Sequence, residues 1–157
     1  MHLPSGAMAR SPSLKTRALG HLARREHSRL ELERKLAVHA RSSEELSAVL
    51  DGLEQSGFLS SARLVEQLVQ TRKSRFGSVR IAHELREKGI AENLIRSALN
   101  GIKETEQESA REVWRKKFGI VPGNAKELGR QTRFLLGRGF LPEVIRRVLR
   151  NPGEEEA

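Results

Sequence analysis

Apolar residues recur every three or four positions through most of the chain, and this spacing predicts amphipathic helices. The clearest example is residues 76–99, FGSVRIAHELREKGIAENLIRSAL. Ile81 and Leu85 lie one helical turn apart, and residues 90–99 carry the stripe of a second helix. Between the two stripes, Gly89 suits the left-handed conformation that often follows a helix C-terminus. The stretch is therefore expected to form two short helices joined by a tight corner.

Polar residues predict where several helices begin. Ser78 is expected to cap the helix that follows it, because its hydroxyl can accept a free amide hydrogen of the first turn. Ser28 and Glu31 have the spacing of a capping box. Asn124 is expected to cap a later helix, and Pro142 suits the first turn of the last one.

The helical pattern occurs three times. A shift of 49 positions superposes the leucines of residues 32–50 on aliphatic residues of 81–99, and a further shift of 50 brings Gly89 onto Gly139. Chance similarity among amphipathic helices is the alternative, but a shared glycine corner argues against it. One unit is too small to bury its own stripe, so the units should stack. We predict an all-α fold, an elongated, curved array of three tandem three-helix repeats.

The helix boundaries predict a domain organisation. It consists of a disordered N-terminal segment at 1–13, three-helix repeats at 14–59, 60–103 and 104–151, and an acidic tail at 152–157. The N-terminal segment lacks the basic and apolar regions of a secretory signal. No apolar run approaches the roughly 18 residues that would cross a bilayer. We expect a soluble cytoplasmic protein, without membrane contacts and monomeric rather than an obligate oligomer.

The composition offers little material for an active site. The absence of cysteine excludes disulfides and thiolate metal sites. Asp51 is the only aspartate, whereas two-metal enzymes need clustered carboxylates, and no glycine-rich phosphate loop is present. His83 and Glu87, one turn apart, form a weak metal or acid–base candidate, for which an exposed helix-stabilising pair is the simpler interpretation. We expect no catalytic residue, metal or cofactor.

Positive charge is the strongest chemical signal. The formal net charge is +9, and the glutamates at 154–156 mask a larger surplus. Such a surplus favours a polyanion or an acidic protein surface as partner, and arginine suits bidentate contacts to phosphate or carboxylate. A solvated surface that keeps the protein soluble is the alternative interpretation. The candidates for partner binding are the basic clusters, namely Arg24, Arg25, Arg72, Lys73, Arg75, Arg80, Arg115, Lys116, Lys117, Arg130, Arg133, Arg138, Arg146 and Arg147.

Several longer stretches of the chain resemble the RecX family, bacterial regulators of the RecA recombinase. They are HSRLELERKL, GFLSSARLVEQLVQTRKSRFGSVRIAHELREKGI, and RKKFG followed by RQTRFLLGRGFLPEVIRRVL. The resemblance covers the chain from about Ala18 to Leu149. One departure is Ser60-Ser61, where the family commonly has an aspartate before the helix, but serine can also cap.

The resemblance implies a fold of tandem three-helix units and a protein that is not an enzyme. It implies binding to RecA and its DNA filament, and inhibition of ATP hydrolysis, strand exchange and filament growth. The protein would thereby modulate recombination and the DNA-damage (SOS) response. Composition and spacing alone do not identify RecA as the partner.

The alternative function is direct nucleic-acid binding by a protein of helix-turn-helix type. Gly89 or Gly139 would then lie at the turn. Asn93 and Arg96 are a thin set of residues for reading bases. Weak nonspecific DNA binding is compatible with both functions.

Overall fold

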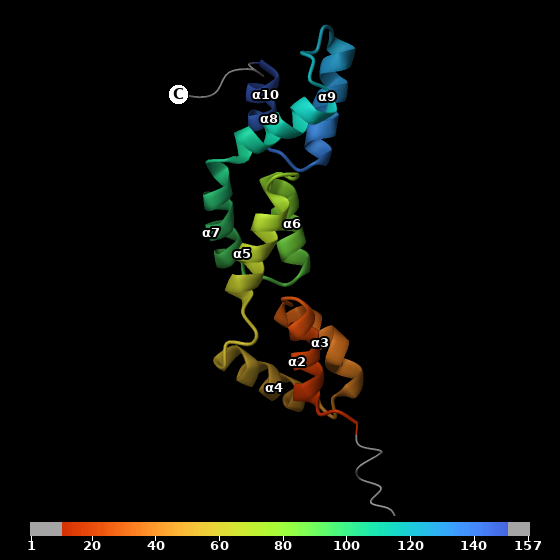
Figure 1. Ribbon diagram of the computed structural model, residues 1–157, viewed down its shortest axis with the longest axis vertical. Coiled ribbons are helices and arrows are strands. Elements are labelled where there is room, and N and C mark those ends of the chain that lie inside the picture. Colours follow the sequence, from red (N-terminus) through yellow and green to blue (C-terminus); the bar gives the residue numbers. More distant parts are fainter. Residues whose placement is uncertain (1–10, 151–157) are drawn as a thin grey trace, which may run out of the picture. The chain divides into compact units, whose positions relative to one another are not determined.

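The computed structural model describes residues 11–150 of the chain. Most of the N-terminal segment predicted to be disordered, and the predicted acidic tail, lie outside these residues. Within residues 11–150 the chain forms nine α-helices and one short 3-10 helix, and no strand (Figure 1). The prediction of an all-α fold built from three-helix repeats is confirmed.

The chain divides into two compact units, residues 1–64 and 65–157. The helices of the first unit are α2 (Leu14–Arg24), α3 (Arg29–Leu36), the 3-10 helix η1 (Ala37–His39) and α4 (Ser43–Gln55). Helix α5 (Ser61–Arg72) begins at the end of the first unit and continues into the second.

The second unit contains two three-helix sets. Its remaining helices are α6 (Ser78–Glu87), α7 (Glu92–Lys103), α8 (Glu106–Lys117), α9 (Ala125–Gly137) and α10 (Pro142–Arg150). Helix α6 packs on α7, and α8, which follows α7, packs on both α9 and α10 (Figure 1). The second and third repeats therefore belong to one compact unit.

Most of the predicted helix starts are confirmed. Ser28 and Glu31 form the reciprocal capping box at the start of α3. The Asn124 side chain accepts the amide hydrogen of Glu127 at 2.8 Å, and Pro142 is the first residue of α10.

The prediction that Ser78 caps α6 is wrong. The N-cap is Gly77, which has no side chain to offer, and Ser78 is the first helical residue. The amide groups of this helix start are instead bound by atoms from α8 and from the corner between α9 and α10, and this arrangement is described below.

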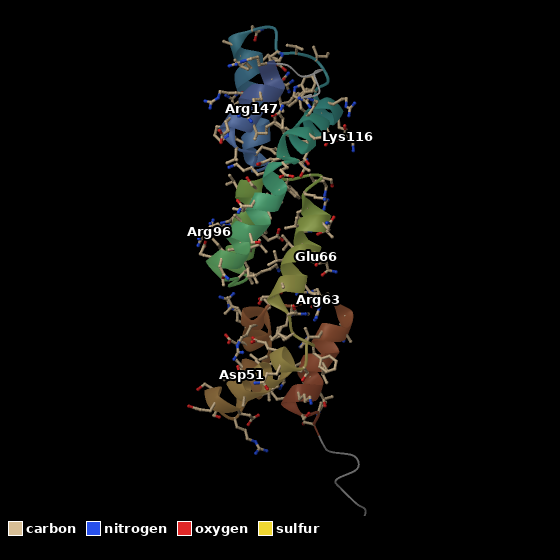
Figure 2. All side chains as sticks on the ribbon, turned by 90° about the vertical axis from the view of Figure 1, so that its left-hand side faces the viewer. Asp51, Arg63, Glu66, Arg96, Lys116 and Arg147 are labelled. Carbon is tan, nitrogen blue, oxygen red and sulfur yellow. The ribbon has the colours of Figure 1, made fainter. Side chains whose placement is uncertain are left out.

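The first unit has a core of leucines with a charged network on its surface. Leucines of α2, α3 and α4 and Leu59 pack together. Across the α3–α4 contact, Arg29 donates to Asp51 at 2.7 Å and to Glu54 at 2.9 Å. These bonds, that to Glu54 above all, hold the pKa of Arg29 above its ordinary value. Asp51, labelled in Figure 2, thus joins two helices.

The third three-helix set has a separate core that contains a buried polar link. Residues of α8, α9 and α10 pack around Phe140 and Ile145. The indole N–H of Trp114 donates to the side-chain oxygen of Gln131 at 2.7 Å, and the Gln131 amide donates to the carbonyl of Ile120 at 3.0 Å. Since buried polar groups are costly unless they are paired, these bonds fix the loop before α9 onto the core.

Leu85→Ala is expected to lower the free energy of unfolding by about 2–5 kcal/mol, because removal of a fully buried leucine side chain leaves a cavity. Leu136→Ala is the matched control, and it should cost under about 1 kcal/mol because this leucine is 45% exposed. Urea unfolding followed by the fluorescence of Trp114, the only tryptophan in a chain without tyrosine, measures both. Equal costs for the two variants would place Leu85 outside the core.

The first unit also contains a buried histidine, His27, next to positive charge. Its Nδ1 lies 3.0 Å from the carbonyl oxygen of Arg25, and its Nε2 lies 2.9 Å from Nζ of Lys35. The ammonium group can only donate, so Nε2 accepts and the ring is neutral. Burial lowers the pKa of His27 from the ordinary 6.5. The hydrogen bond to the Arg25 carbonyl raises this pKa, whereas the charges of Arg25 and Lys35 lower it further.

The stability of the first unit should therefore decrease on acidification. The unfolded chain binds a proton at His27 more readily than the folded chain does. The contribution of neutral His27 to the stability is thus complete above the ordinary pKa of 6.5. It is lost as the pH falls from there through the lowered pKa of His27 in the folded protein. Proton NMR titration gives the pKa of His27, and thermal unfolding between about pH 8 and pH 5 gives the stability. His27→Gln should flatten this dependence and His83→Gln should not; equal profiles would contradict the assignment.

Candidate functional site

The geometry of the candidate site depends on a close backbone contact between the start of α6 and the α9–α10 corner. The amide of Gly77 donates to the carbonyl of Arg138 at 2.9 Å, and the amide of Val79 donates to the carbonyl of Gly139 at 3.0 Å. A Cβ atom on Gly77 would lie 2.4 Å from the Gly139 oxygen. Gly139 has a φ of +85°, and a Cβ atom there would meet Arg80. Both positions therefore require glycine.

A buried carboxylate, Glu106 of α8, completes the cap of α6. Glu106 is 2% exposed. It accepts the amide hydrogen of Ser78 at 2.9 Å and lies 3.0 Å from the Ser78 hydroxyl, which donates to it. The N-terminus of a helix carries partial positive charge, so it stabilises a carboxylate in this position. Three consecutive amide groups at the start of α6 are thus bound by atoms of the third repeat.

This contact brings cations from both repeats to the ring of Phe76. The guanidinium carbon of Arg80 lies 4.1 Å from the ring centroid, that of Arg138 lies 5.4 Å away, and that of Arg75 lies 5.5 Å away. All three distances are within the range of cation–π attraction. Arg138 also donates to the carbonyl of Arg75 at 3.3 Å.

A second ring, Phe134 of α9, continues the arrangement. Arg138 lies 5.2 Å from its centroid and Nζ of Lys117 lies 5.3 Å from it. Phe118 meets Phe134 edge to face at 5.4 Å, and Arg130 lies 5.0 Å from the ring of Phe118. Arg138 therefore links the two rings. We call the set Arg75, Phe76, Arg80, Lys117, Phe134 and Arg138 the basic–aromatic surface.

The structure thus brings five of the predicted binding residues together. Arg75, Arg80, Lys117 and Arg138 belong to the basic–aromatic surface, and Arg130 lies at its margin beside Phe118. These residues come from α6, α8, α9 and the segments next to them, and they are up to 63 positions apart in the sequence.

Several other candidates are held in ion pairs. Arg72 binds Glu84 through two hydrogen bonds, at 3.0 and 3.1 Å, between α5 and α6. Arg25 pairs with Glu31, and both Arg115 and Lys116 pair with Glu112 of their own helix. Arg130 is also paired, with Glu127 at 2.8 Å. These carboxylates reduce the charge available to a partner.

The remaining candidates are not among the cations that contact these rings. Arg24 lines a hollow beside His21 in the first unit. The side chains of Lys73, Arg133, Arg146 and Arg147 form no hydrogen bond or ion pair with the part of the chain that the structure describes. Lys116 and Arg147 project from α8 and α10 on different sides of the third three-helix set in the view of Figure 2.

His83 and Glu87 form the expected surface pair, with 3.0 Å between the imidazole Nε2 and the carboxylate. Both side chains are exposed. Across residues 11–150 there is no group of three histidine, aspartate or glutamate side chains that could hold a metal ion. This pair and Glu84 line, with arginines of α5 and α6, an open hollow of about 470 Å³ beside Phe76.

Sequence reasoning missed three functional elements: the rings that collect the cations, the role of Glu106, and the need for Gly77. The Phe-Gly pair, which occurs at 76–77 and again at 118–119, was the available signal for the rings and for Gly77. The role of Glu106 had no such signal, because a glutamate in the first turn of a helix is commonly a surface residue.

The fold and this surface define an all-helical class of protein, built from tandem three-helix repeats and carrying a basic surface where two repeats of the second compact unit meet. Residues 62–99 match the second three-helix domain of RecX, and residues 104–149 match the third. The regulatory protein RecX of Leptothrix cholodnii is 53% identical over 138 residues, which cover 88% of each chain. That of Chromobacterium violaceum is 45% identical over 94% of this chain and 96% of its own. The chain belongs to the RecX family.

Solved structures support the same fold. The crystal structure of RecX from Lactobacillus salivarius has a TM-score of 0.79 at 20% sequence identity, and the match covers 88% of this chain and 94% of that one. A second structure, of regulatory protein RecX, has a TM-score of 0.75 at 21% identity. The relatives above are named as regulatory proteins and not as enzymes. In residues 11–150, no helix is long and apolar enough to span a membrane.

Glu106→Ala should lower the free energy of unfolding by about 1–3 kcal/mol, because the amide of Ser78 would remain buried without an acceptor. Glu108→Ala removes an exposed acid from the same helical turn and should cost under about 1 kcal/mol. Urea unfolding followed by Trp114 fluorescence measures both variants. A cost for Glu106→Ala no larger than that of its control would show that the cap contributes little.

Proposed function

We propose that the protein regulates the RecA recombinase by binding RecA and its filament on DNA. In this proposal it lowers ATP hydrolysis, strand exchange and filament growth, and so limits recombination and the DNA-damage response. It carries out no reaction of its own and acts in the cytoplasm, where RecA assembles on DNA. The observation that carries the proposal is membership of the RecX family, whose members are named regulatory proteins.

The distribution of charge supports this proposal. A RecA–DNA filament offers carboxylates on the protein and phosphates on the DNA, and both attract arginine. The protein has a formal net charge of +9, and several of its exposed cations are free of internal carboxylates. Such cations accelerate the encounter with an anionic partner and make the affinity depend on salt.

The family relationship also supports a mode of action. A protein of several small units can contact more than one protomer of a helical filament at a time. Contacts that bridge protomers would hinder the movements between them that ATP turnover requires, and contacts at a growing end would block addition of the next protomer. Both effects lower ATP hydrolysis without any catalytic group in the regulator.

Direct binding to nucleic acid by α7 is the second candidate function. Asn93 and Arg96 are exposed near the start of this helix, and Arg96 projects outward in Figure 2. The helix follows the corner at Gly89, whose φ is 76°. A helix-turn-helix protein would place this surface in the major groove. Sequence-specific DNA binding without RecA, lost in Asn93→Ala, would favour this function.

The direct test is RecA ATP hydrolysis on single-stranded DNA with the protein added below and up to one molecule per RecA protomer. We expect inhibition well below equimolar amounts, because one regulator would act on many protomers of a filament. The protein should be shown to be folded by circular dichroism. Unchanged hydrolysis in the presence of folded protein would contradict the proposal.

The contact surface can be tested by charge reversal. Arg72 is unsuitable, because it forms a two-bond ion pair with Glu84 that joins α5 to α6. The double variant Lys73→Glu and Arg75→Glu leaves that ion pair intact. It should inhibit RecA ATP hydrolysis less strongly than the wild type does. The control, Lys103→Glu with Lys126→Glu, changes the net charge equally at exposed positions outside the predicted candidates. Equal inhibition by both variants would remove Lys73 and Arg75 from the interface.

A further inference from the structure

The cations of the basic–aromatic surface are held in place without neutralisation. Arg75, Arg80 and Lys117 form no hydrogen bond or ion pair through their side chains with any residue in the described range 11–150. Arg138 donates one hydrogen bond, to a backbone carbonyl and not to a carboxylate. Contact with an aromatic face orients a cation while its N–H groups stay free for another acceptor. Such an arrangement is suited to an anionic ligand.

The cations lie close enough together to act on one ligand. Arg138 is 5.4 Å from the centroid of Phe76 and 5.2 Å from that of Phe134, so the two rings are no farther apart than the sum of these distances. The hollow beside Phe76 also contains acids, but Glu84 is bound by Arg72 and Glu87 by His83. Arg75 and Arg80, which line this hollow, therefore outnumber Glu87, the one carboxylate of its lining that no arginine binds.

The type of anion follows from what is exposed. Phe76 and Phe134 are half-buried, whereas Arg75, Arg80 and Lys117 are exposed. The binding energy of a protein partner is concentrated in a few anchors that fill well-packed, desolvated pockets, whereas the groups exposed here are cations around half-buried rings. The surface thus suits the charged backbone of a nucleic acid, independent of its base sequence.

We propose that the basic–aromatic surface binds the phosphate backbone of nucleic acid, without base specificity. This inference rests on the proposed function in one respect, since the DNA of a RecA filament would be its ligand there. The binding itself needs no RecA, because the four cations belong to one compact unit. The contact between Gly77 and Gly139 keeps the cations of the two repeats beside each other.

The test is fluorescence anisotropy of a labelled oligothymidine, about 20 nucleotides long so that it exceeds a typical single-strand site, with the full chain and no RecA. The variant carries Arg75→Gln, Arg80→Gln and Lys117→Gln, which remove charge from exposed side chains. It should bind at least about tenfold more weakly at low salt, and the slope of log affinity against log salt should decrease by about 2 for three lost phosphate contacts.

The matched control carries Arg41→Gln, Lys103→Gln and Lys126→Gln, a loss of the same charge at exposed positions outside both the surface and the predicted candidates. It should keep most of the affinity and the slope. Equal losses in both variants would show that binding follows net charge, and would overturn the proposal. A labelled polyglutamate peptide is the second probe. If the surface variant loses the peptide but not the oligothymidine, the surface binds acidic protein and the proposal is also overturned.

A further variant tests the role of the rings without changing charge. Phe76→Leu with Phe134→Leu should weaken oligothymidine binding several-fold while leaving the salt slope close to that of the wild type, because the cations remain but are no longer held. Circular dichroism and Trp114 fluorescence confirm folding. Undiminished affinity in this folded variant would show that the rings do not organise the site.

The same variants, added to the RecA ATPase assay, separate this inference from the proposed function. Inhibition by the wild type together with unaltered DNA binding by the surface variant would overturn the inference alone. DNA binding that depends on the surface, without any inhibition by the wild type, would overturn the proposed function alone.

Discussion

The close backbone contact between Gly77 and Gly139 is the constraint on which the second unit depends. It allows the carbonyl oxygens that end α9 to bind amide groups that begin α6. Because the unpaired ends of two helices satisfy each other, α6 begins without a capping side chain at its own N-cap residue, Gly77. A side chain at either glycine would separate the two segments. The second and third repeats are thereby held in one unit.

This contact brings basic side chains from distant parts of the sequence to the same aromatic ring. The segment before α6 supplies Arg75 and Phe76, and the end of α9 supplies Arg138. Glu106 strengthens the same junction from α8, where its carboxylate binds Ser78. A buried carboxylate is tolerated there because it lies at the positive end of a helix. The site and the packing of the two repeats therefore share one set of interactions.

The charged residues of the protein have two different roles. Arg29 and Arg72 each bind carboxylates across a helix contact, so their charge is used within the fold. Arg80 and Lys117 have aromatic rings as their neighbours and keep their charge for the solvent or for a ligand. A count of basic residues cannot separate these roles, because the difference lies in the neighbour and not in the residue.

The sequence by itself determined the local structure and the family. Apolar spacing predicted the helices, and the left-handed corners were predicted at Gly89 and Gly139, because these features depend on neighbouring residues. The quoted motifs predicted the RecX family. Only the tertiary structure decided how the repeats meet and which cations gather. The cap of α6 shows the reason: the sequence suggested Ser78, whereas Glu106, 28 positions away, and the α9–α10 corner bind the helix start. Contacts between distant segments depend on packing, which residue spacing does not reveal.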